Sequence, residues 1–209
     1  KASFLSVCAG FIVQLRKGHY DAYACVTIVT GYLQNTCYDS PMKCIDLLSR
    51  EILSDGAAYH MVRASLETRR PKTLHSQDFF ELIWVQNGEM RLTLSETKLD
   101  LTEGNLVFIR AGEAHALHAL ADDTFVVSVA LSSDLISSIG DRHPELAGSF
   151  FWSEAKLPHI AFREMREFAS LNKHALRLER VTRTRLEAEA FLLPLCAELV
   201  DEAKEKREE

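Results

Sequence analysis

The chain has 209 residues, of which 47% are hydrophobic, and it carries a formal net charge of −6 at pH 7. This length and composition suffice for one well-buried core with at most a small appendage. Lysine and arginine are dispersed among the acidic residues, so the sequence shows no basic face for nucleic acid. The longest apolar run, residues 3–15, is shorter than the roughly 18 residues of a membrane span. We therefore expect no membrane association.

The first 41 residues differ in character from the rest of the chain. They hold three of the five cysteines, four of the five tyrosines and only five charged residues. One hypothesis is that translation naturally starts at Met42 and that residues 1–41 are not native. The alternative is that this segment packs on the domain as an extra strand or helix. The cysteines are odd in number and show no C-x-x-C spacing, which favours reduced thiols in a cytoplasmic protein.

A predicted strand over residues 75–85 carries polar groups at a regular spacing. Alternate side chains of a strand point to the same side of its sheet. One face holds His75, Gln77, Phe79, Glu81, Ile83 and Val85, and the other holds Phe80, Leu82 and Trp84. Both faces are apolar over most of their length, which predicts a strand buried between two sheets or inside a closed one. Three polar groups should converge at one end of the first face.

Further short strands follow, separated by turns. Asn87-Gly88 predicts a hairpin turn, and glycines at 104 and 112 predict two more turns. The predicted strands cover residues 89–94, 98–101, 105–109 and 124–131. Short strands punctuated this regularly favour a β-sandwich or barrel.

After residue 131 the apolar spacing becomes helical. Ser132 could cap a short helix that runs through Ile139 and ends at Gly140. The aromatic cluster at 149–152 should fold back on the barrel. From Ile160 onward, apolar residues recur at intervals of three and four, which predicts two helices in a hairpin.

The predicted hairpin has two further features. Pro194 should kink or split its second helix. Its apolar stripe exceeds what one barrel edge needs, so a dimer face is one interpretation. The alternative is that the helices only cover the barrel.

Two motifs in the strand region resemble those of the cupin family. His75, Gln77, Glu81 and Gly88 match H-x-H-x3-E-x6-G, with Gln77 in place of the second histidine. Gly104, Gly112 and His115 match G-x5-P-x-G-x2-H-x3-N, with Arg110 and Ala119 in place of the proline and the asparagine. More narrowly, residues 56–205 resemble the N-terminal sensor domain of AraC-type transcriptional regulators.

This resemblance implies a mainly β protein with α: a cupin-like β-barrel, also called a double-stranded β-helix or jelly roll, followed by a C-terminal helical hairpin. We expect the barrel at residues 42–131 and a helical extension for dimerisation and linkage at 132–209. In such regulators the barrel binds a small effector, often a sugar, and the helices form a homodimer. DNA would be bound only through a helix-turn-helix domain that this sequence does not contain.

Four residues are candidate metal ligands: His75, Gln77, Glu81 and His115. Imidazole nitrogen and carboxylate oxygen are ligands that Mn, Fe, Ni or Zn accept. Two features weaken this interpretation. The amide of Gln77 binds such metals less well than imidazole does, and Arg110 near the pocket mouth would repel a cation and attract an anion.

The candidate ligand-binding set adds Trp84 and Arg110 to those four residues. With Trp84 or Phe79 as a stacking surface, the same groups suit a sugar-like polyol. A third alternative is purely structural: both histidines close hydrogen bonds at the barrel rim, and Glu81 satisfies a buried donor.

Two functions of different classes follow. The first is the effector-sensing and dimerisation domain of an AraC-type regulator, which is not an enzyme. The second is a stand-alone cupin enzyme such as a dioxygenase or isomerase. Its chemistry would depend on the metal, because the sequence contains no nucleophile elbow, phosphate loop or nucleotide fingerprint. The helical extension favours the sensor.

Overall fold

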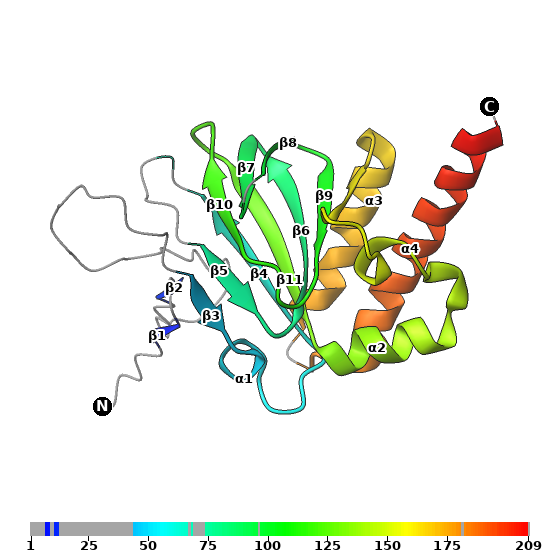
Figure 1. Cartoon of the computed structure of the whole chain (residues 1–209), viewed down its shortest axis with the longest axis horizontal. Helices are drawn as coiled ribbons and strands as arrows, with labels where there is room; N and C mark the ends of the chain where they lie inside the picture. Colours follow the sequence, from blue (N-terminus) through cyan, green and yellow to red (C-terminus); the bar gives the residue numbers. More distant parts are fainter. Residues whose placement is uncertain are drawn as a thin grey trace, which may run out of the picture.

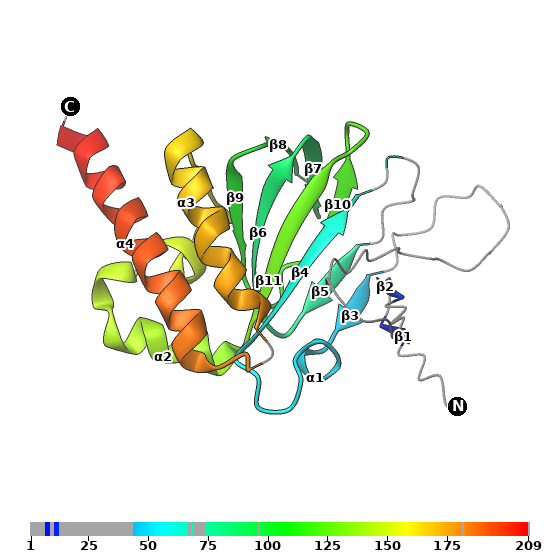
Figure 2. The same cartoon turned by 180° about the vertical axis from the view of Figure 1, so that it is seen from behind.

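The computed structural model describes residues 7–8, 11–12, 44–66, 68, 74–95, 97–180 and 182–208. Two five-stranded sheets face each other, and a layer of helices covers the outer side of the second sheet (Figures 1 and 2). In spatial order, sheet one contains β3 (Ile45–Leu47), β5 (His75–Gln77), β10 (His115–Ala119), β7 (Glu89–Leu94) and β8 (Lys98–Thr102). Sheet two contains β12 (His159–Phe162), β9 (Asn105–Ile109), β6 (Phe80–Asn87), β11 (Phe125–Leu131) and β4 (Tyr59–Ser65). The predicted cupin-like architecture is confirmed.

Strong β-formers explain the centre of sheet two. The β11 sequence, FVVSVAL, is dominated by β-branched and aromatic residues, and this strand pairs antiparallel with both β4 and β6. Alternation along β6 then separates two cores. Ile83 and Val85 face the space between the sheets, where they pack with Leu92 and Val107. Residues of the opposite face of β6 pack against the helices.

The helical layer is built from α2 (Ser133–Arg142), α3 (Met165–Ala175) and α4 (Arg185–Glu208), with the 3-10 segments η1 (Pro144–Leu146), η2 (Phe150–Trp152) and η3 (Leu176–Glu179). A short helix, α1 (Ser49–Ile52), follows β3. The predicted cap of α2 is confirmed, because the Ser132 hydroxyl accepts a hydrogen bond from the Leu135 backbone N–H at 3.3 Å. The aromatic cluster also folds back as predicted, since Phe150 and Phe151 are buried against Phe108 of β9.

The predicted continuous strand over 75–85 is wrong. The chain turns at Asp78 and Phe79, so that β5 lies in sheet one and β6 in sheet two. Local hydrogen bonds explain the turn. The Asp78 carboxylate accepts hydrogen bonds from the backbone N–H and the hydroxyl of Ser49, and the Asp78 N–H donates to the Leu47 carbonyl at 3.3 Å.

The helical region also departs from prediction in three places. Residues 159–162 form β12, which pairs with β9, so the first helix of the hairpin begins only at Met165. Helix α2 continues past Gly140 to Arg142. The glycine is needed at this position for packing, because a Cβ there would collide with the Trp152 ring, whose Nε1–H donates to the Ile136 carbonyl at 3.2 Å. Pro194 does not split α4, which is continuous from residue 185 to 208.

Residues 1–41 lie largely outside the described part of the chain. Within them, β1 (Val7–Cys8) and β2 (Phe11–Ile12) pair with each other in a two-stranded sheet. Among the described residues, none of the helices combines the length and the apolar character needed to cross a membrane.

Candidate functional site

Three side chains from both sheets meet inside the barrel. His75 of β5 and His115 of β10 are direct partners across sheet one, and their ring centroids are 4.2 Å apart. Glu81 reaches them from β6 in sheet two. The ligand atoms of these three residues all lie within 4.8 Å of one another. The spacing of the two sequence motifs therefore identified a real cluster.

Glu81 is oriented by a residue that the sequence analysis missed. The Ser128 hydroxyl of β11 donates a hydrogen bond to Glu81 Oε1. The other carboxylate oxygen, Oε2, lies 3.4 Å from Nε2 of His115. Ser128 is the polar residue within the apolar sequence of β11, and this exception was the signal that could have revealed it.

The charges of this pair reinforce each other. Burial by itself opposes ionisation of Glu81, yet its interactions with His115 and the Ser128 hydroxyl, together with the charge of His75, lower its pKa to about 2. Burial by itself would lower the pKa of His115, but Glu81 and the Glu113 backbone carbonyl raise it. An anionic carboxylate therefore faces an imidazole that readily accepts a proton.

Gln77 lies next to this cluster, on the same face of β5 as His75. The side chain is buried, and neither its amide nitrogen nor its amide oxygen has a hydrogen-bond partner within the described residues. Oε2 of Glu81 and Nε2 of His115 likewise lack a well-formed hydrogen bond there. Because a buried polar group without a partner is destabilising by about 1–3 kcal/mol, these atoms mark a place where a ligand would gain binding energy.

The two predicted stacking residues lie on different sides of sheet two. Trp84 lies on the opposite face of β6 from Glu81, where its Nε1–H donates to Asn172 Oδ1 at 3.1 Å and its ring stacks on Phe191. This location corrects the expectation that Trp84 lines the ligand pocket. Phe79 is buried against Leu47 and Ala130, and Ala130 is the direct partner of Glu81 in the neighbouring strand.

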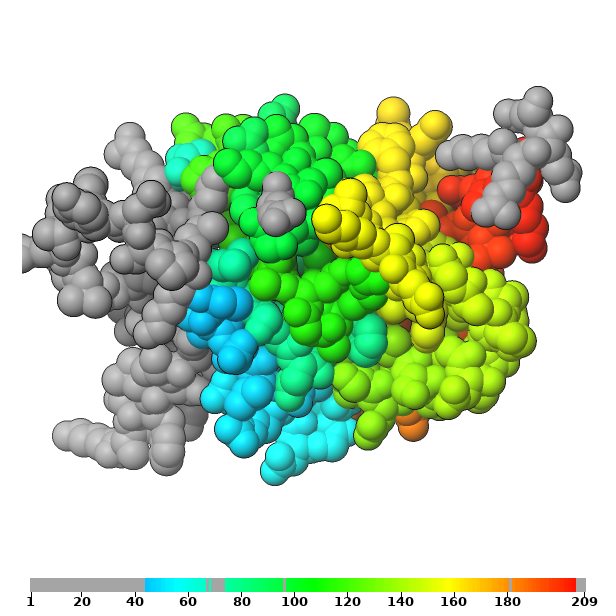
Figure 3. All heavy atoms as spheres, in the orientation of Figure 1, coloured from blue at the N-terminus to red at the C-terminus, as the bar shows by residue number. Residues whose placement is uncertain are grey.

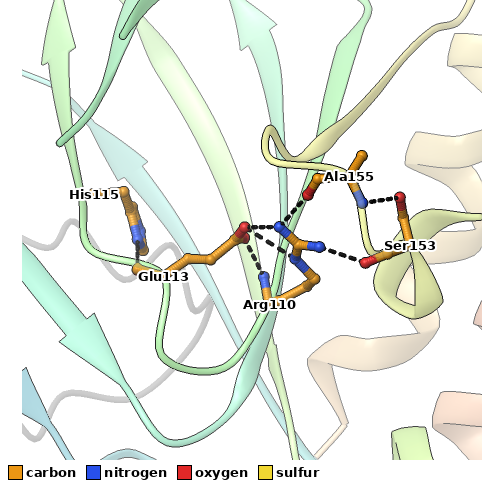
Figure 4. Close-up of polar contacts among 5 residues, drawn as sticks. All are labelled: Arg110, Glu113, His115, Ser153 and Ala155. Carbon is orange, nitrogen blue, oxygen red and sulfur yellow. Dashed lines mark hydrogen bonds and ion pairs between the residues drawn. The ribbon is translucent and has the colours of Figure 1, made fainter. Parts of the chain in front are cut away.

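Arg110 also departs from its expected role as a cation at the pocket mouth. Figure 4 shows its side chain directed away from His115, toward Glu113 and the backbone around Ser153. The guanidinium is therefore neutralised by a neighbouring carboxylate, and the predicted repulsion of a metal by Arg110 loses its basis.

His60, which lies outside both sequence motifs, points into the same interior. It pairs with Ala130 across the sheet, and Ala130 in turn pairs with Glu81. Two strand spacings of about 4.8 Å separate His60 from Glu81. Burial, and then the charge of Arg183, lower the pKa of His60 to about 4. The barrel interior thus contains a third imidazole, and the lowered pKa of His60 keeps this one neutral near pH 7.

Comparisons with known proteins agree with this architecture. Residues 62–131 match the family model of the cupin domain. The chain has no significant match among curated protein sequences. Among solved structures, an apo variant of ToxT from Vibrio cholerae strain SCE256 aligns with a TM-score of 0.53 at 13% identity, over 69% of this chain and 56% of that chain.

Two other solved structures align less closely. Wild-type ToxT from the same strain, with an unsaturated fatty acid bound, gives a TM-score of 0.47 at 13% identity, over 71% of this chain and 55% of that chain. KdgF from Halomonas sp. gives 0.34 at 18% identity, over 38% of this chain and 76% of that chain. The chain thus spans only about half the length of the ToxT chains that it matches. The two facing sheets and the family match together identify a cupin domain within this chain.

Proposed function

We propose that this chain is the effector-sensing and dimerisation part of an AraC-type transcriptional regulator. The observation that carries the proposal is the enclosed polar cluster of His75, Gln77, Glu81 and His115 inside a largely apolar barrel. The resemblance of residues 56–205 to such regulators and the fold shared with ToxT support it. On this proposal the protein is cytoplasmic, and an attached helix-turn-helix domain contacts DNA.

The chemistry of the cluster favours a small polar ligand or polar head group. The Gln77 amide can donate and accept, Glu81 Oε2 accepts, and Nε2 of His115 changes role with its proton. A polyol would pair with all three groups, and apolar side chains of the barrel would surround the rest of the molecule. A carboxylate head group, as in the fatty acid found in a ToxT structure, would instead face the negative charge of Glu81. We therefore favour a sugar-like ligand.

Hydrogen bonds connect the ligand cluster to the helical layer. The backbone of Asp78, between Gln77 and Glu81 in sequence, accepts a hydrogen bond from the Ser133 hydroxyl of α2 at 2.9 Å. The next residue of α2, Asp134, accepts one from Arg185 of α4 at 2.7 Å. A ligand that shifts the turn at Asp78 would thereby bias the packing of α4, and with it a homodimer formed through the helices.

A metal-dependent cupin enzyme is the second candidate. His75, Glu81 and His115 supply two imidazoles and a carboxylate within 4.8 Å of one another, a set that fits Mn, Fe, Ni or Zn. Gln77 would be the fourth, weaker ligand. A bound ion would act as a Lewis acid toward a substrate oxygen. On this candidate, Ser128 orients the carboxylate.

Thermal unfolding with a panel of candidate ligands tests both functions. The panel contains pentoses, hexoses, an unsaturated fatty acid and the four divalent metals. A ligand at 100 times its Kd stabilises by about 2.7 kcal/mol, which corresponds to a rise in Tm of roughly 5–10 °C at this chain length. We expect one sugar-like compound to give such a rise, and Glu81→Gln to remove it.

The matched control is Glu89→Gln, which changes an exposed carboxylate of β7. It should leave the ligand-induced rise intact. A rise that survives in Glu81→Gln would place the ligand elsewhere and refute this site. A rise produced only by metals, together with turnover lost in His75→Ala and His115→Ala, would favour the enzyme.

A further inference from the structure

The turn at residues 110–113 precedes His115, and its central residue, Gly112, is hydrogen-bonded to sheet one. The Glu113 N–H donates to the Arg110 carbonyl at 3.2 Å, which closes the turn. Gly112 adopts a positive φ of 82° within it, a conformation that favours glycine. Its N–H donates to the Gln77 carbonyl at 2.7 Å. The turn therefore borders the candidate site directly.

An ion pair closes the same turn a second time. The Arg110 backbone N–H donates to Glu113 Oε2 at 2.8 Å, and its guanidinium Nε–H donates to Oε1 at 2.9 Å. The guanidinium Nη2 of Arg110 also donates to Glu113 Oε1. The two side chains are only 20% and 19% exposed, so water screens this pair less than a surface salt bridge. We define these contacts as the Arg110–Glu113 clamp.

The clamp also contacts a segment outside the turn. The Arg110 guanidinium donates to the carbonyls of Ser153 and Ala155, the latter at 2.8 Å (Figure 4). This connection directly follows η2, whose two phenylalanines are buried in the core. Figure 3 shows the yellow chain beyond it lying against the green barrel. Arg110 thus connects the turn to the segment that directly follows η2.

His115 receives its orientation from the clamped turn. Its Nδ1 lies 3.1 Å from the Glu113 carbonyl oxygen, and because a carbonyl can only accept, Nδ1 must carry a hydrogen. Nε2 then faces Glu81. We propose that Arg110 and Glu113 are positioning residues for the His115 ring. They hold the ring so that Nδ1–H donates to the Glu113 carbonyl and Nε2 faces the candidate site. This inference builds on the proposed function, because it assigns Nε2 of His115 to ligand binding.

The clamp depends on a residue that departs from the cupin motif. The cupin motif to which residues 104–119 are similar has proline at the position of Arg110. Proline lacks the backbone N–H that Arg110 donates to Glu113, and it lacks the guanidinium. The ion pair therefore provides, through side chains, a restraint that a proline ring would provide covalently.

Long-range ¹H–¹⁵N spectra of the histidine rings at pH 8 test the proposal without any ligand. The wild-type chain should show one set of His115 ring signals with hydrogen on Nδ1. Glu113→Gln keeps the backbone carbonyl but removes the charge, and Arg110→Gln removes the guanidinium. Both should give a second set of signals or exchange broadening, while Arg110→Lys should lie between them and the wild type.

The control is Arg91→Gln, which breaks the exposed Arg91–Asp100 pair elsewhere in sheet one. It should leave the His115 signals unchanged. If Arg110→Gln fails to fold, Glu113→Gln and Arg110→Lys still decide the test. Unchanged His115 signals in folded clamp variants would overturn the proposal.

Zinc titration provides a second readout. Residues that orient a metal-binding histidine typically contribute 10–100-fold to affinity. We expect a loss of about that size in Glu113→Gln and none in Arg91→Gln. Equal zinc affinity in Glu113→Gln and wild type would count against the clamp. A wild-type chain that binds no zinc would refute the metal candidate, whereas the ring signals would still decide the clamp.

Discussion

His60 makes stability depend on pH through a single side chain. Its imidazole is partly buried, Nδ1 has no partner among the described residues, and its pKa of about 4 lies below the ordinary value of 6.5. The unfolded chain therefore binds a proton more readily between these two values. The stability that the folded protein has with His60 neutral is fully present above pH 6.5, and it is lost as the pH falls toward 4.

We expect His60→Gln to remove that part of the pH dependence. One unit of pKa shift corresponds to 1.36 kcal/mol, and because the ring is partly exposed, we expect wild type to lose about 1 kcal/mol more than the variant between pH 7 and pH 5. Urea denaturation at both pH values measures this difference. Parallel losses in the two proteins would show that Arg183 and burial do not perturb His60.

At the residue scale, spacing predicted chemistry only where it followed a motif. His75, Glu81 and His115 were identified because a motif fixes their distance along the chain. Ser128 and His60 were missed because their roles depend on which strands become neighbours. Trp84 was assigned to the wrong side, since residue type alone does not show which face of a buried strand meets the ligand.

At the scale of elements, one buried cation joins α4 to the barrel. The Arg163 side chain is 1% exposed and pairs with Glu198 at 2.7 Å and Glu202 at 2.6 Å, which are 50% and 38% exposed. The Arg163 N–H also donates to the carbonyl of Gly104, beside the turn between β8 and β9. A side chain at Gly104 would collide with the Arg163 carbonyl, at 2.7 Å from its Cβ.

Removing the anions should therefore destabilise the protein more than removing the cation. The double variant Glu198→Gln/Glu202→Gln leaves a buried guanidinium without a counter-charge, and we expect a loss of about 3 kcal/mol, at the low end for a broken buried pair because water reaches the exposed partners. Arg163→Met keeps the aliphatic packing and frees two carboxylates that can hydrate, for a loss of about 1 kcal/mol. Urea denaturation measures the loss of stability in both variants. A larger loss in Arg163→Met than in the double variant would mean that Arg163 stabilises the protein mainly through its packing.

The type of an element was predictable where turn residues mark both ends of a strand-like segment. The strands at 89–94, 105–109 and 124–131 appear close to their predicted bounds because turn residues delimit each of these segments. The turn at Asp78 was not predictable, because it depends on hydrogen bonds with Ser49, far away in sequence. Strand β12 was mistaken for helix, since a four-residue edge strand has no period of its own and forms by pairing with β9.

At the scale of the whole molecule, two separate cores share sheet two. Its inner face packs on sheet one and carries Glu81 of the candidate site, whereas its outer face packs on the helices. Residues of the same strands therefore contact both the barrel interior and helices α3 and α4. This arrangement suits a sensor, because one sheet carries the ligand residues on one side and the proposed dimerisation helices on the other.

The two facing sheets are formed entirely from strands between residues 45 and 162. In the described part of the chain, β1 pairs with β2, not with either large sheet. We therefore expect a chain that starts at Met42 to fold with a Tm close to that of the full sequence.

At this chain length, 1 kcal/mol of stability corresponds to about 2–4 °C in Tm. A difference in Tm below about 2 °C would therefore show that residues 1–41 contribute little to stability. Differential scanning calorimetry of the two chains, with zinc and sugar titrations of each, measures the contribution. A Tm lower by roughly 5 °C or more, or a loss of ligand binding, would instead show that residues 1–41 pack on the barrel.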